Sequence, residues 1–283
     1  MRILVTGATG LLGPYLMTAF SKLGDVVGVS TMDYNLTAER SVKTMMMDHF
    51  PNVVVHAAAL TDVEECGLKP YAATVSNCGM TENLVTHMPA DCRFIYISTD
   101  MVYSGIGPHK EHSKSENPIN MYGMSKFMGE FAAAKAPNHL IVRTNMYGKA
   151  LSVRKSSLVD FLLGRLKNGD PFQVFTDSLF TPLWTKTLAE KLVVMAKSQK
   201  VGTFNLGAAT GMSKAKFAML LANEMGLSAQ GMRPVESASL PNRVPRPLDT
   251  RMDITRTDAA FGLGLPSMEN DIKAMCESIK CTN

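Results

Sequence analysis

The sequence has little of what several classes of protein require. Charged residues make up only 19% of the 283 residues, the formal net charge is +4, and Lys and Arg are scattered rather than gathered in blocks. Nothing in that pattern points to nucleic acid as a partner. No apolar run approaches the about 20 residues that span a bilayer, and the first one, ILVTGATGLLG, lacks the flanks of a signal peptide. We expect a soluble protein without a nucleic-acid or membrane partner.

Cysteine is also scarce. The chain has an odd number of cysteines and no CxxC pair; they stand at positions 66, 78, 92, 276 and 281. This usage is typical of free thiols in a reducing compartment. We therefore predict a cytoplasmic location.

Short runs rich in Val and Ile alternate with segments of helical length. Strands are predicted at 2–6, 26–30, 52–59, 93–98 and 139–144, with helices at 11–22, 37–50, 71–87 and 122–135 between them. Such an alternation indicates βαβ units, and strands with few polar interruptions indicate a sheet that is covered on both faces. The predicted fold class is α/β, a Rossmann-type doubly wound parallel sheet.

After Tyr147 the alternation becomes less regular. Helices are predicted at 156–167, 185–198 and 213–225, with strands at 171–175 and 203–207. We assign 1–148, with return segments near 177–206, to a dinucleotide-binding domain, and 149–283 mainly to a smaller mixed α/β substrate-binding lobe. The stretch 233–251 holds four prolines and four arginines, which predicts an extended loop.

A glycine-rich turn follows the first strand. Gly7, Gly10 and Gly13 have the spacing that lets a backbone approach a pyrophosphate at the start of a helix. The second strand ends at Ser30, where a hydroxyl can donate to a 2′-phosphate that a carboxylate repels, although Asp33 lies three residues on. NADP(H) is the favoured cofactor, and NAD(H) stays open.

Tyr122 and Lys126 stand four residues apart at the start of a predicted helix, so that both side chains reach one ligand. An ammonium beside a phenol favours the phenolate, which suits proton transfer to or from a carbonyl oxygen. A lysine that merely lies along a half-buried ring is the competing interpretation. Thr99 ends a strand 23 residues upstream, where parallel sheets bind ligands, and this favours a site. We expect the glycine after Tyr122 to leave room for a ligand.

With these residues in view, the chain resembles the extended short-chain dehydrogenases/reductases over almost its whole length. The motifs are TGATGLLG, VVVHAAA, NCGMTENL, ISTDMVY and YGMSKFMGE, in family order. Within that superfamily it is most similar to the dTDP-4-dehydrorhamnose reductases, through AALTDVEECGLKP, STDMVY, GPHKEHSKSENPINMYGMSK and RPLDTRMD. The resemblance implies that Tyr122 protonates the substrate oxygen, Lys126 tunes it and holds the nicotinamide ribose, and Thr99 orients the carbonyl.

The resemblance also assigns binding residues. It implies that the cofactor contacts Gly7, Gly10, Leu11, Leu12, Gly13, Ser30, Asn35, Leu36, Ala58, Ala59, Thr61, Tyr122 and Lys126. It implies that the substrate contacts Thr99, Asp100, Asn145 and Arg251. Two positions depart from the family pattern. Asn35 stands where aspartate is usual, and Asn145 and Met146 occupy a segment that usually carries tryptophan. We therefore expect a sugar pocket that differs from that of the relatives.

The function that follows is an NAD(P)H-dependent reductase of a nucleotide-activated keto sugar, with hydride delivered to C4. Two alternatives stay open: an epimerase with retained NAD, and a silent NADP-binding regulatory subunit. The family also suggests a homodimer through helices near 71–87 and 122–135. The arginines of the stretch 233–251 have two interpretations: they clamp a diphosphate, with Arg251 favoured, or they are ordinary surface charge. These late arginines are Arg233, Arg243, Arg246 and Arg251. His109, Glu111 and His112 lack a further ligand nearby, so no metal is predicted.

Overall fold

The computed structural model describes residues 1–111, 116–151, 156–240 and 243–282. Its main sheet has six parallel strands in the order β10-β5-β4-β3-β1-β2. Their bounds are β1 Arg2–Thr6, β2 Asp25–Val29, β3 Val53–His56, β4 Arg93–Thr99, β5 His139–Thr144 and β10 Gly202–Leu206. The predicted Rossmann-type parallel sheet is confirmed, and β2 lies at its edge.

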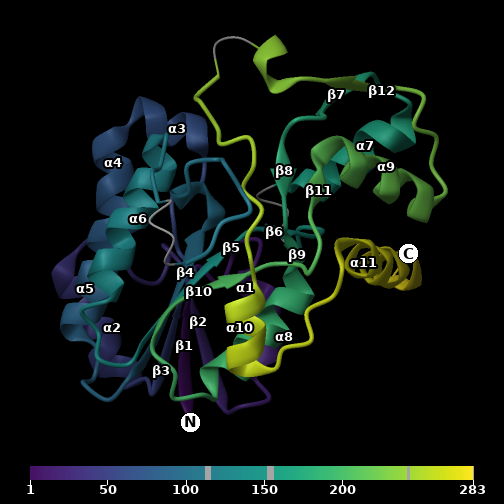
Figure 1. Cartoon of the computed structure of the whole chain (residues 1–283). Coiled ribbons are helices and arrows are strands. Elements are labelled where there is room, and N and C mark those ends of the chain that lie inside the picture. The colour runs from purple at the N-terminus through teal and green to yellow at the C-terminus, as the bar shows by residue number, and fades with distance from the viewer. Residues whose placement is uncertain (112–115, 152–155, 241–242, 283) are drawn as a thin grey trace.

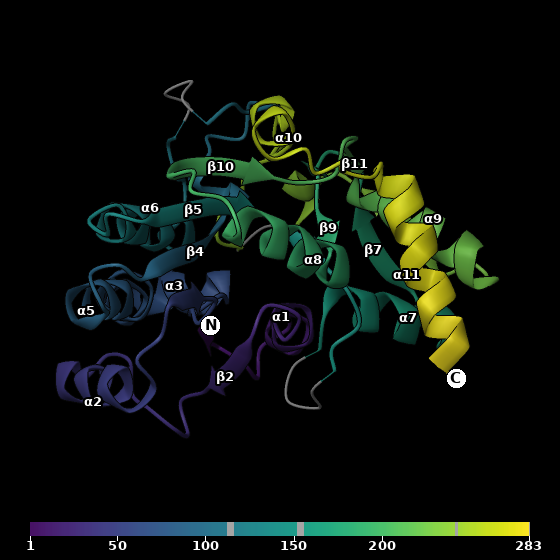
Figure 2. The same ribbon diagram turned by 90° about the horizontal axis from the view of Figure 1, so that it is seen from below.

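Helices cover both faces of this sheet (Figure 1 and Figure 2). One face carries α2 (Glu39–His49), α5 (Met80–His87) and α6 (Met121–Ala133); the other carries α1 (Gly13–Phe20) and α8 (Thr185–Ala196). Side chains alternate between the two: Ile95 and Ile97 belong to the core cluster under α1 and α8, and Phe94 and Tyr96 to the cluster under α2 and α5. This is why the middle residues of most of these strands are apolar.

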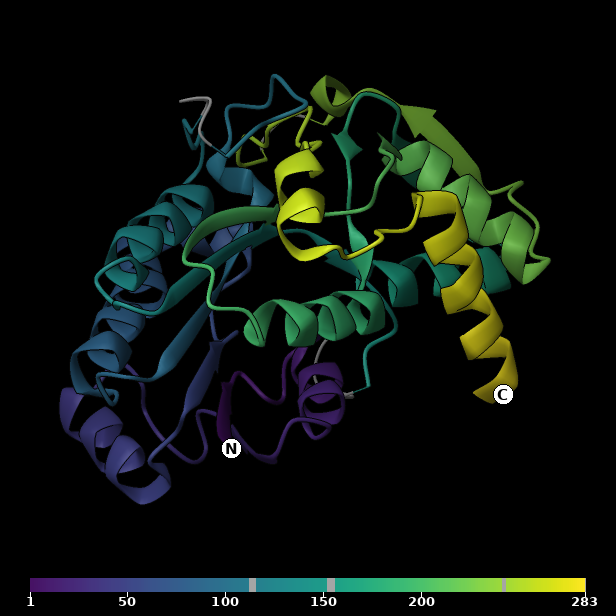
Figure 3. The ribbon, with the colours of Figure 1, turned by 60° about the horizontal axis from the view of Figure 1, so that its bottom comes forward.

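The second half of the chain builds a smaller unit beside the sheet. It contains α7 (Leu158–Asn168), α9 (Lys214–Met225) and α11 (Met268–Thr282). It also contains two short strand pairs, β7 (Phe172–Phe175) with β12 (Met232–Val235) and β8 (Leu179–Phe180) with β11 (Met212–Ser213). Figure 3 shows α10 (Thr255–Phe261) on the sheet side and α11 beyond it. The domain boundary near residue 148 stays a prediction.

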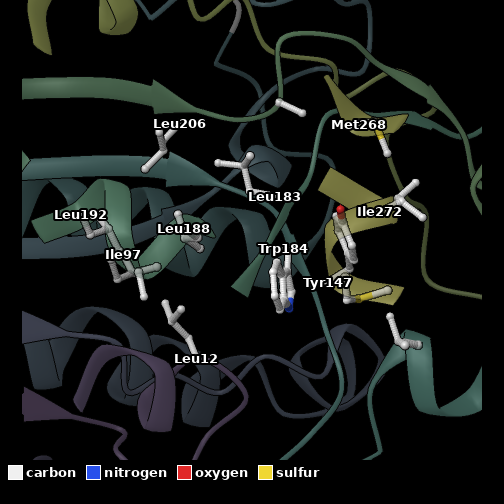
Figure 4. Packing of buried hydrophobic residues seen from close by; sticks show 14 of the residues in the cluster. Leu12, Ile97, Tyr147, Leu183, Trp184, Leu188, Leu192, Leu206, Met268 and Ile272 are labelled. Carbon is white, nitrogen blue, oxygen red and sulfur yellow. The ribbon is translucent and has the colours of Figure 1, made fainter. Parts of the chain in front are cut away.

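The apolar core is continuous between the two parts. Tyr147, on β6 (Met146–Tyr147), and Trp184, on β9 (Leu183–Trp184), lie between sheet residues such as Ile97 and the α11 residue Ile272 (Figure 4). The two strands pair in parallel, Met146 with Leu183 and Tyr147 with Trp184. The small unit is therefore fixed to the carboxyl side of the sheet by buried side chains.

Several local predictions differ from the structure. The helix predicted over 71–87 is α4 (Pro70–Thr74), a π-helical turn at Val75–Gly79 and then α5. The extended loop predicted over 233–251 begins within β12 and includes a 3-10 turn at Ser237–Ser239. Three helices were not predicted: α3 (Val63–Leu68), α10 and α11. α3 and α10 are too short to give a clear apolar period, whereas α11 has one, with Ile272, Met275 and Ile279 buried on one face.

Candidate active site

Three chain segments meet at the carboxyl edge of the central strands. Thr99 ends β4, Asp100 opens the 3-10 turn Asp100–Val102, and Asn145 follows β5. The Asn145 Nδ2 donates to Asp100 Oδ2 at 2.7 Å, and Thr99 Oγ1 donates to Asp100 Oδ1 at 3.2 Å. Burial raises the pKa of Asp100, and these two hydrogen bonds oppose the rise. The structure thus brings together three of the four predicted substrate residues.

The start of α6 is held against the 3-10 turn. Asn120 caps the helix by accepting from Gly123 N at 2.8 Å, and its Nδ2 donates to Pro245 O at 3.0 Å. A Cβ on Gly123 would lie 2.2 Å from the Met101 carbonyl oxygen. The expectation that this glycine makes room for a ligand was wrong, because the room is taken by the backbone of Met101. Gly123 instead lets Tyr122 sit close to Thr99.

Tyr122 is half-buried, and its phenol lies near the Thr99 hydroxyl. Burial raises the pKa of the phenol above its ordinary value of 10, while the nearby Thr99 hydroxyl opposes that rise. The predicted lowering by the neighbouring ammonium is therefore not what this geometry gives. A phenol that stays protonated at neutral pH is suited to donate a proton.

Lys126 lies one turn further along α6 and is 2% exposed. Its Nζ is 4.0 Å from the centroid of the Tyr96 ring. Burial lowers the pKa of Lys126 to about 7, and Glu130 works in the opposite direction. The side chain therefore changes charge near neutral pH, unlike a lysine that lies along the surface of a protein.

The π-helical turn supplies a residue that the sequence analysis missed. Asn77 is buried, and its Nδ2 donates to Ser125 Oγ at 2.9 Å and to Leu60 O at 3.0 Å. Its backbone oxygen accepts from Tyr96 Oη at 3.3 Å. A π turn aims one side chain away from the ordinary helical direction, and such turns are frequent at functional sites. Asn77 thereby ties the loop after β3 to the helix that carries Tyr122.

The backbone packs closely around the glycine turn. Gly7 has φ +72°, and a Cβ there would lie 2.7 Å from Ala58 N; a Cβ on Gly13 would lie 2.3 Å from Ala8 O. α1 begins at Gly13, and its cap residue Leu12 makes no side-chain hydrogen bond to the first turn. The first turn of α1 therefore has no side-chain cap from Leu12, and the two glycines are required by the close packing of the backbone.

The remaining predicted cofactor residues lie around the same edge. Gly10 N donates to Gly7 O at 2.9 Å. Leu11 precedes α1, and Ala58, Ala59 and Thr61 follow β3, with Thr61 exposed. At the end of β2, the Asp33 carboxylate accepts from both the N and the Oγ of Ser30 at 2.8 Å. Asn35 Oδ1 accepts from Thr37, and Leu36 is buried.

A cavity of about 220 Å³ opens in the smaller unit. One wall is the segment 243–248, hereafter the strap, and the opposite wall includes Phe175, Ser178 and Lys214. Arg243 lies over the Phe175 ring at 5.2 Å, and Arg246 pairs with Glu64 of α3 at 2.8 Å. The cavity combines cations with an aromatic wall, which suits an anionic aromatic ligand.

The late arginines therefore separate into two groups. Arg243 and Arg246 line the cavity, whereas Arg233 is exposed on β12. The Arg251 guanidinium makes two hydrogen bonds to the Asp249 carboxylate, donating from Nε to Oδ1 at 2.9 Å and from Nη2 to Oδ2 at 2.7 Å. Among the lining residues, the cations are Lys214, Arg243 and Arg246. The contact of Arg251 with the substrate stays a prediction. Because Asp249 already occupies the Arg251 guanidinium, Arg243 is the better placed candidate for binding a diphosphate.

The histidine motif has structural roles in the part of the chain that is described. His109 stacks on Tyr103 at 4.5 Å, and Glu111 accepts from Asn205 N at 2.9 Å, while His112 lies outside the described residues. Within residues 1–111, 116–151, 156–240 and 243–282, no group of three His, Cys, Asp or Glu side chains is arranged to hold a metal. In the same ranges, no helix has the length and apolar character needed to cross a bilayer.

Comparison with known families gives a match over nearly the whole chain. The family model described as "RmlD substrate binding domain" matches residues 1–281. A dTDP-4-dehydrorhamnose reductase of Sinorhizobium fredii is 26% identical over 293 residues, covering 97% of this chain and 96% of the relative. Methionine adenosyltransferase 2 subunit beta of Rattus norvegicus is 27% identical over 282 residues, covering 93% and 83%.

Solved structures have the same architecture. The crystal structure of a dTDP-4-dehydrorhamnose reductase from Bacillus anthracis, in complex with NADP, has a TM-score of 0.91 and 23% identity, covering 98% of this chain and 99% of the other. At that identity the likeness concerns the fold. It extends over both the sheet and the smaller unit.

Proposed function

The chain belongs to the family described as the RmlD substrate binding domain, and on that basis we propose that it is an NAD(P)H-dependent reductase of a nucleotide-activated keto sugar, with hydride delivered to the C4 carbonyl. The observation that supports this most is the half-buried Tyr122 at the carboxyl edge of the sheet, near the buried Thr99 and one turn before the buried Lys126. A carbonyl reductase needs a hydride site, a proton donor and a bound substrate next to each other.

In the proposed mechanism the protein supplies orientation and a proton. The nicotinamide, when bound, supplies the hydride to the carbonyl carbon. Tyr122 donates its phenolic proton to the carbonyl oxygen, and Thr99 orients that oxygen by a hydrogen bond. Lys126 in its charged form would hold the nicotinamide ribose, and the phenolate left on Tyr122 regains a proton from solvent. Ketone, reduced cofactor and one proton become alcohol and oxidised cofactor.

We propose NADP(H) as the preferred cofactor, with NAD(H) also accepted. The S. fredii relative is named as a reductase, and the B. anthracis protein was solved with NADP. Glycine-turn residues would hold the pyrophosphate, and Ser30 lies where a 2′-phosphate would be bound. The Ser30 hydroxyl already donates to the Asp33 carboxylate at 2.8 Å. The carboxylate competes with a 2′-phosphate for that hydroxyl, so we expect only a small preference for NADPH over NADH.

The direct test is consumption of reduced cofactor against a panel of nucleotide-activated 4-keto sugars, run in parallel with NADPH and NADH. We expect turnover with at least one keto sugar and a lower KM for NADPH than for NADH. Consumption of neither cofactor with any sugar, by protein that binds NADPH tightly, would contradict the reductase proposal. A protein that carries NAD through purification and needs no added cofactor would instead support an epimerase.

The likeness to methionine adenosyltransferase 2 subunit beta supports a second candidate, a nucleotide-binding subunit of a partner enzyme. Retention of both Tyr122 and Lys126 favours the catalytic proposal, because a purely regulatory protein requires neither. Tight NADPH binding without turnover, together with a change in the activity of a bound partner, is the result that would favour the subunit.

We also propose a homodimer in a reducing, cytoplasmic setting. Met124, Met128 and Phe131 lie on one face of α6, at 41%, 37% and 63% exposure. An apolar stripe of this kind is characteristic of a covered surface. Phe131→Glu is expected to convert a dimer into a monomer in light scattering. The matched control is Phe50→Glu, since Phe50 is 62% exposed and follows the C-terminus of α2. This substitution should leave the mass of the particle unchanged. A wild-type monomer would contradict the dimer.

A further inference from the structure

Tyr122, Lys126 and Glu130 follow one another in steps of four residues along α6. Residues spaced in this way lie on one face of a helix, with Cβ atoms of neighbours about 5–6 Å apart. Lys126 is 2% exposed and Glu130 is 5% exposed. The proposed mechanism uses the phenol and the ammonium, and it leaves open what the buried carboxylate one turn further along the helix does.

The Glu130 carboxylate is held in a fixed position by two other strands. Arg143 of β5 donates from Nε to Oε1 at 2.9 Å and from Nη2 to Oε2 at 2.7 Å, and Ser98 of β4 donates to Oε1. Through Nη1, Arg143 also donates to Glu116 Oε1 at 2.7 Å. One cation thus serves two carboxylates, and the group carries one negative charge in excess. Such an excess is costly inside a protein unless a further cation lies nearby.

Lys126 is a cation on the Glu130 side of α6. Its Nζ lies over the Tyr96 ring, and Tyr96 Oη donates to the Lys126 carbonyl oxygen at 3.2 Å. No carboxylate of the described residues lies within ion-pair distance of this ammonium. The charge that opposes the effect of burial on the pKa of Lys126 is that of Glu130, one helical turn away.

The other titratable groups around Lys126 are uncharged near neutral pH. Burial lowers the pKa of His56, at the end of β3, to about 3. Burial raises the pKa of the Tyr96 phenol well above its ordinary value. It also raises the pKa of the Cys66 thiol to about 11 and the pKa of the Cys78 thiol above its ordinary value. None of these four side chains supplies the charge that an ammonium needs.

The charged groups on the elements that pack against α6 are engaged elsewhere. Asp100, in the 3-10 turn, accepts from Asn145 Nδ2 at 2.7 Å. Arg93 and His139 begin β4 and β5, at the opposite edge of the sheet from Tyr122. The side chains of α3 and α5 form pairs toward the surface: Glu64 with Arg246, Glu65 with Lys69, Glu82 with Lys135, and His87 with Glu39. Glu130 is therefore the charged group that is placed to act on Lys126.

We propose that Glu130 is a positioning residue for the reaction: its carboxylate, held in place by Arg143 and Ser98, keeps the Lys126 ammonium charged and so sets the upper end of the pH range in which the site works. Glu130 acts through Lys126 and not on the substrate itself. A negative charge near an ammonium favours the protonated form, so that its removal lets the lysine lose its proton at lower pH. This inference rests on the proposed function.

Carbon-13 NMR of protein with labelled lysine measures the titration of Lys126 directly, without a substrate. The signal of Lys126 is identified by its absence in Lys126→Met, and its Cε shift is followed from about pH 5 to about pH 10. We expect a midpoint of about 7 in the wild type. In Glu130→Gln the midpoint should be lower by about one pH unit, the effect of one charge a helical turn away. An unchanged midpoint in Glu130→Gln would overturn the proposal.

Glu116→Gln is the matched control, because it removes a charge from the same arginine. Arg143 donates to Glu116 and to Glu130 at the same distance, 2.7 Å, but Glu130 is the carboxylate that acts on Lys126. The control should move the midpoint by less than about 0.3 pH unit, and Glu130→Asp, which keeps the charge, should restore most of the wild-type value. Equal shifts in Glu116→Gln and Glu130→Gln would assign the effect to Arg143 and its carboxylates as a group and overturn the proposal.

The pH profile of kcat separates this role from a purely structural one. Glu130→Gln should approach the wild-type kcat near about pH 5.5 and fall further behind as the pH rises, because its lysine is deprotonated earlier. A loss of the same factor at every pH would mean that Glu130 only supports the fold, and it would overturn the proposal.

The outcomes also distinguish this inference from the proposed function. If the Lys126 midpoint shifts as expected but the wild type reduces no keto sugar, the assignment of Glu130 holds and the reductase proposal fails. If the wild type reduces a keto sugar while Glu130→Gln leaves the midpoint unchanged, the assignment of Glu130 fails alone. Should Glu130→Gln not fold, the double variant Arg143→Met and Glu130→Gln is compared with Arg143→Met, since these two proteins differ in the same charge.

Discussion

Tyr122→Phe is expected to lower kcat for keto-sugar reduction by about 10²- to 10⁴-fold, the usual contribution of a positioned proton donor. The substitution removes only the hydroxyl, which is the group that lies near the Thr99 hydroxyl. The ring stays in its place at the start of α6. Binding of NADPH, followed by fluorescence titration, should therefore remain within about threefold of the wild type.

The matched control removes a different buried phenolic hydroxyl. Tyr147→Phe deletes a hydrogen bond to Asp271 of 3.0 Å and should cost about 1 kcal/mol of stability, with little change in kcat. If Tyr122→Phe turned over at the wild-type rate, the phenol would not be the proton donor.

A pH profile adds a second criterion: the rate of reduction should fall as pH rises through about 7, because the Lys126 ammonium is then lost.

Arg143→Met is expected to lower the free energy of unfolding by about 3–5 kcal/mol, the usual cost of removing one partner from a buried ion pair. Arg143 is 4% exposed and donates to Glu130 Oε2 at 2.7 Å and to Glu116 Oε1 at 2.7 Å. Glu130 also accepts from Ser98 Oγ, next to Thr99. Two carboxylates would be left without their cation close to the active site. Urea denaturation measures the change.

Arg165→Met is the control for that measurement. Its ion pair with Asp170 is exposed, at 3.5 Å, and should contribute at most about 1 kcal/mol. In the double variant Arg143→Met and Glu130→Gln, part of the lost stability should return, since one of the uncompensated charges is gone. A loss below about 1 kcal/mol in Arg143→Met would mean that Glu130 and Glu116 are neutral or hydrated in the folded protein.

The features that depend on residues close together along the chain could be predicted from the sequence. The alternation of apolar runs predicted the parallel sheet, and the four-residue step from Tyr122 to Lys126 placed both on one helix. The glycine spacing predicted a tight turn at the start of α1, and at Gly7 and Gly13 the backbone packs too closely for a side chain. Each of these predictions was made from residues close together along the chain, even though the sheet itself joins six strands.

What the sequence could not predict depends on contacts between distant segments. Asn77 reaches Ser125, 48 residues away, through a π turn that has no signal in the apolar period. Lys214 is recognisable only as a cation in the first turn of a helix, and its cavity is built from three other segments. The preference for Arg251 came from its motif, and nothing in the motif shows that Asp249 occupies its fork.

The strap has a consequence for how the protein folds. It is attached through Arg246 to Glu64, 182 residues earlier, and through the Pro245 carbonyl to Asn120, 125 residues earlier. Contacts of such sequence separation close late, because the loop entropy must be overcome before they form. The cavity therefore exists only in molecules that have completed folding. A nucleotide bound there should slow unfolding and raise the melting temperature, while leaving the refolding rate unchanged.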